Sequence, residues 1–138
     1  MTFLKRVLLI LFISCVFFVV IDRVVKKDVA DVVGAENYSF HEVSIVHPDY
    51  GLKILSSEEV ASLKEYLLNS SCTYNGSIKG VQSLVVYDGT LFHVFAYTEK
   101  NELEGSFYIS DTGKMYIGYK EYILGDNQIY CFLEECYR

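Results

Sequence analysis

Three histidines, His41, His47 and His93, are the side chains best suited to acid–base or metal chemistry in this sequence. His41 and His47 lie six residues apart, close to the carboxylates Glu42 and Asp49. This grouping supports one hypothesis, a small metal-binding domain or an enzyme. No HExxH or comparable ligand spacing accompanies it, and His93, which lies among apolar residues, is expected in the core.

Motifs for covalent catalysis or phosphate binding are missing from the sequence. It has no GxSxG nucleophile motif, and its nine glycines are dispersed rather than gathered in a phosphate-binding loop. We therefore predict no catalytic residue, no metal ligand set and no cofactor, and we favour a function without catalysis.

Three cysteines, Cys72, Cys131 and Cys136, follow the N-terminal segment. In an oxidising compartment Cys72 is expected to form a disulfide with Cys131 or Cys136, and Cys136 is favoured because Cys131 shares an expected strand face with apolar residues. Such a bridge closes a loop of roughly 60 residues and stabilises the fold by about 4 kcal/mol in the chain-entropy model. The alternative is three thiols that act as small apolar side chains. Zinc is disfavoured, because no CxxC motif is present.

Tyrosine is unusually frequent, with twelve residues, all after residue 37. Tyr108, Tyr116, Tyr119 and Tyr130 are candidates for a binding face, since tyrosine combines a large apolar ring with a polar tip. The alternative interpretation is that tyrosine simply suits β-strands.

The N-terminal segment is strongly apolar from residue 7 to residue 21 and follows Lys5 and Arg6. Flanking residues extend the run to 3–25, which is long enough to cross a membrane if the nearby cations reach the headgroups. We predict an uncleaved membrane anchor over residues 1–28, with a cleaved signal peptide or a lipoprotein signal at Cys15 as alternatives. A short basic stretch before an apolar run is typical of secretory signals, so the domain is expected to be extracytoplasmic.

The rest of the chain is acidic. Residues 29–138 contain seven basic and sixteen acidic residues, a net charge of −9. Such a surface repels phosphate backbones, so no nucleic-acid partner is expected.

Alternating and helical patterns predict one small domain over residues 38–138, joined to the anchor by a connector at 29–37. The signals are a strand over 38–46, a turn over 47–51, and a helix that begins at Ser56 or Ser57 with capping-box spacing to Glu59. Two hairpins follow, at 81–97 around Asp88-Gly89 and at 103–119 around Gly113, and then a last strand over 128–133.

These elements predict an α+β fold: an N-terminal transmembrane helix followed by a helix packed on an antiparallel meander. The element order resembles cystatin-like and PepSY-like folds, although no residue motif accompanies the resemblance, and the order alone implies no function. We expect a single-pass, membrane-anchored, non-enzymatic binding or accessory module with a protein partner. The alternatives are the His41/His47 metal-binding domain or enzyme, and an inhibitor or immunity-type protein.

Overall fold

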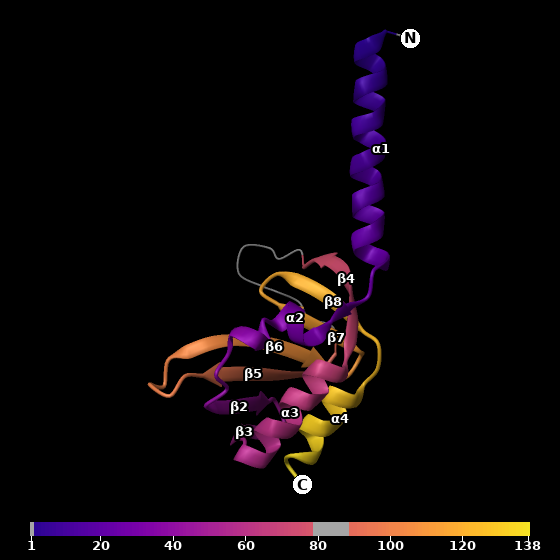
Figure 1. Cartoon of the computed structure of the whole chain (residues 1–138). Helices are drawn as coiled ribbons and strands as arrows, with labels where there is room; N and C mark the ends of the chain where they lie inside the picture. The colour runs from indigo at the N-terminus through magenta and orange to yellow at the C-terminus, as the bar shows by residue number, and fades with distance from the viewer. Residues whose placement is uncertain (1, 79–88) are drawn as a thin grey trace.

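The chain forms a long apolar helix followed by an α+β domain built on one antiparallel, open, eight-stranded sheet (Figure 1). A computed structural model describes residues 2–78 and 89–138. The expected fold class is therefore confirmed. The apolar helix, α1 (Phe3–Val24), buries none of its residues against the domain.

The sheet runs in the spatial order β1-β4-β8-β7-β6-β5-β2-β3. The bounds of the strands are β1 (Lys27–Asp28), β2 (Glu42–His47), β3 (Gly51–Ile54), β4 (Ser71–Ser77), β5 (Leu91–Tyr97), β6 (Leu103–Ser110), β7 (Lys114–Ile117) and β8 (Lys120–Leu124). Every pairing between neighbours is antiparallel. Two short strands, β1 and β3, thus form the two edges of the sheet.

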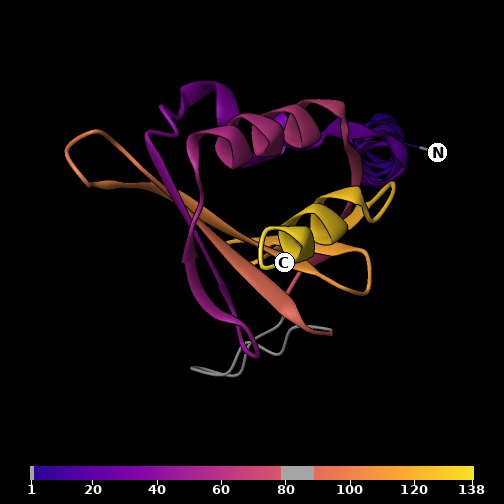
Figure 2. The same cartoon turned by 90° about the horizontal axis from the view of Figure 1, so that it is seen from below.

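The helices pack on one face of this sheet (Figure 2). They are α2 (Val29–Val33), α3 (Ser57–Asn69) and α4 (Gln128–Glu135), and the 3₁₀ turn η1 (Ala35–Asn37) follows α2. Alternate residues of β5, Phe92, Val94 and Ala96, are buried beneath them. The alternate buried residues of the strand therefore pack against the buried faces of α3 and α4 in a single core.

Helix α3 begins where the sequence predicts. The Ser56 hydroxyl accepts a hydrogen bond from the Glu59 N–H at 3.2 Å, and Glu59 accepts one from the Ser56 N–H at 2.8 Å. This reciprocal capping box satisfies two amides that the first helical turn leaves without partners. Val60, Leu63 and Leu67 then face the core at helical spacing.

The hairpin of β6 and β7 is also confirmed, with Gly113 in the left-handed region at φ +79°. Of the other expected hairpin, β5 is present as the second strand. Its expected first strand, 81–87, lies outside the described residues. The strand expected over 38–46 begins later, at Glu42, because Phe40 has a φ of +48° that interrupts an extended backbone.

The prediction for the last element is wrong. Residues 128–133, expected as a strand, belong to helix α4. Ile129, Tyr130 and Leu133 are its buried side chains, a spacing of one and three residues that a strand would divide between two faces. Strands β3, β4 and β8 were not predicted. The expected connector contributes Val29, Ala30 and Val33 to the core.

Only Val25 and Lys26 separate α1 from β1, so the apolar helix joins the sheet almost directly. Lys27 of β1 pairs with Cys72 of β4 and its ammonium lies 2.5 Å from the Asp22 carboxylate of α1. The α1 helix is long and apolar enough to cross a membrane, a test that signal sequences also pass. Figure 1 shows α1 rising from the β4 side of the domain, roughly along the direction in which the strands are stacked.

Candidate functional site

The outer edge of β3 combines an exposed backbone with exposed apolar side chains. Lys53 points to the helix-covered face, where it meets Glu59 of α3. Its neighbours Leu52 and Ile54 therefore point to the opposite face, because successive side chains alternate along a strand. Leu52 is 68% exposed and Ile54 is 58% exposed. Val46 of β2, which pairs with Leu52, extends this apolar surface.

The hydrogen-bonding pattern of β3 directs the backbone polar groups of Leu52 and Ile54 away from β2. The Leu55 N–H donates to the Val43 carbonyl at 2.9 Å. In an antiparallel ladder only alternate residues bond to a given neighbour. Lys53 and Gly51, like Leu55, therefore direct their backbone N–H and C=O groups toward β2. Leu52 and Ile54 consequently direct their N–H and C=O groups away from β2, and no described strand pairs with that side.

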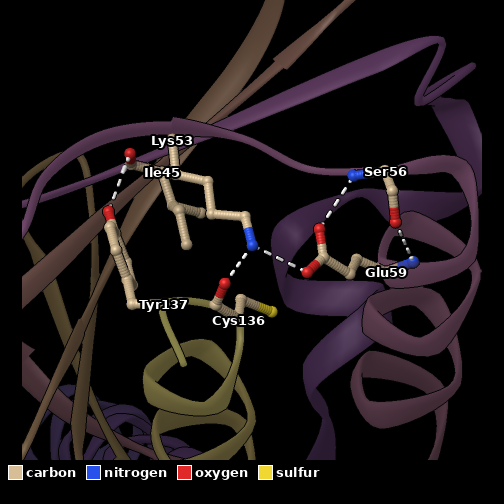
Figure 3. Close-up of polar contacts among 6 residues, drawn as sticks. All are labelled: Ile45, Lys53, Ser56, Glu59, Cys136 and Tyr137. Atoms are coloured by element: carbon tan, nitrogen blue, oxygen red, sulfur yellow. Dashed lines mark hydrogen bonds and ion pairs between the residues drawn. The ribbon is translucent and has the colours of Figure 1, made fainter.

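A polar clamp holds β3 against α3 and α4 (Figure 3). The Lys53 ammonium donates to Glu59 at 2.8 Å and to the carbonyl oxygen of Cys136, the residue that caps α4. Beyond it, the Tyr137 hydroxyl lies 2.7 Å from the Gly51 carbonyl oxygen and 3.2 Å from that of Ile45. These contacts fix the inner side of the β2–β3 hairpin and leave its outer side open.

The clamp also sets the charge of Glu59. Burial by itself raises the pKa of this carboxyl, but the Lys53 ammonium and the Ser56 N–H stabilise the anion and hold the net pKa below its ordinary value. Glu59 thus stays ionised while it serves both the cap of α3 and the attachment of β3.

A groove of about 340 Å³ adjoins β3 where it turns into α3. Its walls include Ile54, Phe40, His41 and Lys64. The Phe40 ring is buried, and the Lys64 ammonium lies 5.3 Å from the ring centroid, within the range of a cation–π contact. The positive φ of Phe40 is held by Glu104, whose two carboxylate oxygens accept the Ser39 and Phe40 N–H groups at 2.8 and 3.2 Å. The groove therefore has one fixed wall beside the open strand.

The structure does not bring His41 and His47 together. His41 immediately precedes β2 and His47 is its last residue, and six residues at about 3.3 Å each place them roughly 20 Å apart. His47 is buried, where its Nδ1 accepts the Asp49 N–H at 3.1 Å and its ring stacks on Tyr50. Within residues 2–78 and 89–138, no group of three or more His, Cys, Asp and Glu side chains is arranged to hold a metal ion.

The four tyrosines expected to share a binding face do not gather on one surface. Tyr130 is buried on α4, where burial raises its pKa to about 12. Tyr116 is buried on the sheet opposite Tyr108, whose ring stacks on His93 at 3.9 Å. Tyr119 alone is widely exposed, in the turn between β7 and β8. Three of the four contribute to packing, and two of these, Tyr108 and Tyr116, lie in strands as the strand-propensity alternative implies, whereas Tyr130 lies in a helix.

The expected Cys72–Cys136 disulfide is not formed, and all four cysteines are free thiols. Cys72 lies on β4 just after α3 ends, whereas Cys136 lies beside Glu59 near the start of α3. A helix of 13 residues is about 20 Å long, well beyond the roughly 7 Å between Cα atoms that a disulfide permits. Burial raises the pKa of each thiol to about 11. The alternative of buried thiols therefore describes Cys72 and Cys136, while Cys131 is exposed.

Comparison of the chain with models of protein families, with curated proteins and with solved structures finds no match. The resemblance to cystatin-like and PepSY-like folds consequently remains one of element order. The edge of β3 was not among the residues singled out from the sequence. The only signal for it is the alternation of Leu52, Lys53 and Ile54 after the Pro48 turn.

Proposed function

We propose that this chain is a membrane-tethered, non-enzymatic binding module that takes an extended segment of a partner protein as an added strand beside β3. The observation that carries the proposal is the outward backbone of Leu52 and Ile54, which offers hydrogen bonds next to exposed apolar side chains. Strand addition of this kind obtains its affinity from main-chain bonds and its specificity from alternate side chains.

The tether is α1, which has the length and hydropathy of a membrane-crossing helix. With the basic stretch of Lys5 and Arg6 on the cytoplasmic side, the domain lies outside the cytoplasm. Six strand spacings of about 4.8 Å separate β4, which contacts α1, from β3 at the opposite edge. The open edge is thus roughly 29 Å further from the bilayer and faces the extracytoplasmic space.

The partner strand comes from a different protein rather than from a second copy in the same membrane. Two antiparallel β3 strands related by symmetry share a two-fold axis perpendicular to the sheet. Because α1 runs roughly along the strand-stacking direction (Figure 1), that rotation would direct the second α1 away from the first membrane. Two copies anchored side by side therefore cannot pair through β3.

Charge indicates the chemistry of the partner segment. The domain carries a net charge of −9 over residues 29–138, with Asp49 in the turn that precedes β3 and Glu58 in the first turn of α3, which follows it. An extended segment with apolar side chains at alternate positions and basic flanks complements this edge. The charges would mainly speed the encounter and exclude acidic competitors.

Site-specific photocrosslinking in membranes of the source cells tests the proposal. A photoreactive residue is placed at Leu52 or, as a matched control, at Leu103, which is 56% exposed and lies at the start of β6. We expect a discrete adduct with one protein from position 52 and none from position 103. Peptide mapping of the adduct should locate the crosslink in an alternating apolar segment.

A proline variant separates strand addition from simple apolar contact. Ile54→Pro removes the outward N–H of residue 54, a loss that edge strands tolerate. Ile54→Thr keeps that N–H and, like the natural isoleucine, has a β-branched side chain. We expect Ile54→Pro to abolish the adduct from position 52 without lowering the melting temperature, and Ile54→Thr to retain it. Equal adducts from both photoreactive positions, or an adduct that persists in Ile54→Pro, would overturn the proposal.

A further inference from the structure

The edge of the domain nearest to α1 is less acidic than the rest of the domain, since the cations Arg23, Lys26, Lys27 and Lys120 accompany the carboxylates Asp22, Asp28 and Glu121 there. Tyr119, which is 71% exposed, lies in the turn between β7 and β8, and the exposed Lys120 begins β8. Arg23 and Lys26 lie at the junction of α1 and β1. In the described parts of the chain, Arg23, Lys26 and Lys120 form no ion pair with a carboxylate. We call Arg23, Lys26, Tyr119 and Lys120 the basal rim.

Two contacts connect the β7–β8 turn to the end of β4, the strand that contacts α1. Ser77 of β4 pairs with Lys120, and the Ile78 N–H donates to the Tyr119 carbonyl at 2.6 Å. One residue earlier, Gly76 lies against Arg23, whose guanidinium nitrogen would be 3.6 Å from a Cβ at that position. The turn is therefore held beside the last turn of α1 by the end of β4.

The height of the rim follows from the length of α1. The 22 residues of α1 span about 33 Å, and the hydrocarbon core of a bilayer is about 30 Å thick. An inserted α1 thus ends at the headgroup layer, and the β4 end that contacts Arg23 lies at the same level. Tyrosine is enriched at this depth, because its ring suits the hydrocarbon boundary and its hydroxyl suits water.

We propose that the basal rim is a second membrane contact, in which Tyr119 enters the headgroup layer and Lys120, Arg23 and Lys26 contact anionic lipid headgroups. The inference rests on the proposed tether but goes beyond it. The occupant is the bilayer that α1 itself crosses, since the rim is continuous with the end of that helix. Two carboxylates at this edge, Asp22 and Glu121, pair with Lys27 and Lys114, so the rim cations face outward unopposed by them and an anionic lipid surface attracts this edge more than the rest of the acidic domain. Two attachment points hold the sheet upright and keep the β3 edge away from the lipid.

Single-tryptophan fluorescence tests the inference, because the chain contains no tryptophan. The full chain is reconstituted into phosphatidylcholine vesicles with and without phosphatidylglycerol, as Tyr119→Trp or as Tyr50→Trp. Tyr50 is the matched control, since it is 51% exposed in the turn before β3, at the other edge of the sheet. Lipids brominated near the top of the acyl chains should quench Trp emission at position 119 about twofold or more and leave position 50 unchanged.

The charge of the rim is tested in the same system. Lys120→Glu in the Tyr119→Trp background should weaken quenching in vesicles that contain phosphatidylglycerol and change it little in pure phosphatidylcholine. Resistance to carbonate extraction is measured on every sample, so that failure of the tether is recognised separately. A chain that stays membrane-bound while position 119 is quenched no more than position 50 would overturn the inference and leave the tether standing.

Discussion

His93 is the side chain whose packing has the clearest consequence for pH dependence. Its ring lies between those of Phe95 and Tyr108, at 3.8 and 3.9 Å between centroids. Its buried Nε2 has no hydrogen-bond partner among the described residues. Burial lowers the pKa of His93 from its ordinary 6.5, so the folded state binds this proton less readily than the unfolded state does.

We predict that the fold loses stability in acid through His93. Its contribution is fully present above pH 6.5 and is lost as the pH falls from there through the lower folded-state pKa, by at most about 1.4 kcal/mol per pH unit. Urea unfolding of the full chain in detergent, at pH values between 8 and about 5, should show a smaller loss for His93→Phe than for the natural chain. His41→Gln, at an exposed position, is the control variant. An identical slope in His93→Phe would contradict the assignment.

The sites predicted from the sequence do not form where they depend on which residues the fold brings together. Cys72 and Cys136 have the types needed for a disulfide, but nothing in the sequence reveals that α3 separates them. His41 and His47 are close in sequence, yet an extended β2 holds them apart. The burial of Tyr130 likewise depends on α4 packing on the sheet, which the sequence did not predict.

At the scale of elements, the Lys53 clamp is the contact that connects β3 to both α3 and α4. Lys53→Met keeps the aliphatic stem and removes the ammonium, so the Cys136 carbonyl and Glu59 lose their common donor. We expect a loss of about 1 kcal/mol in the free energy of unfolding, since the pair is partly exposed and screened. Urea denaturation measures this loss.

A double-mutant cycle with Glu59→Gln isolates the contact within the clamp. Lys53→Met and Glu59→Gln should be less than additive, because each alone removes the same ion pair. Glu59 contributes stability above its ordinary pKa of 4.5, and this contribution is lost as the pH falls through its lower folded-state pKa. Strict additivity of the two substitutions would contradict the clamp as described.

Elements with strong local signals were predictable, and elements defined by tertiary contacts were not. The capping box of Ser56 and Glu59 and the turn at Gly113 are local, and both were located correctly. The segment of α4 is rich in aromatic and β-branched residues, which favoured a strand, but its burial pattern is helical. Strand β3 is only four residues long, so the alternation of Leu52, Lys53 and Ile54 is too short to predict a strand, and β4 is largely polar.

For the whole molecule, the proposal that α1 is an uncleaved tether predicts that α1 alone keeps the chain in the membrane. Phe17→Asp together with Val19→Asp should abolish retention in membranes, because each charge at the centre of a span costs about 2.5–3.5 kcal/mol on the insertion scale. The conservative pair Phe17→Leu and Val19→Leu should remain in the carbonate-resistant fraction. A native mature chain that begins at Cys15 or Glu36 by mass spectrometry would instead show that the anchor is cleaved.

The central claim is that α1 holds this domain at a membrane, on the extracytoplasmic side. Cys131 supplies a direct probe, because it is the exposed cysteine of the domain, whereas Cys72 and Cys136 are buried with pKa values of about 11. Intact cells are treated with a membrane-impermeant maleimide and the labelled peptides are identified by mass spectrometry. The account predicts modification of Cys131 before lysis in the natural chain and none in Cys131→Ser. Modification of Cys131 only after the membrane has been permeabilised would contradict it.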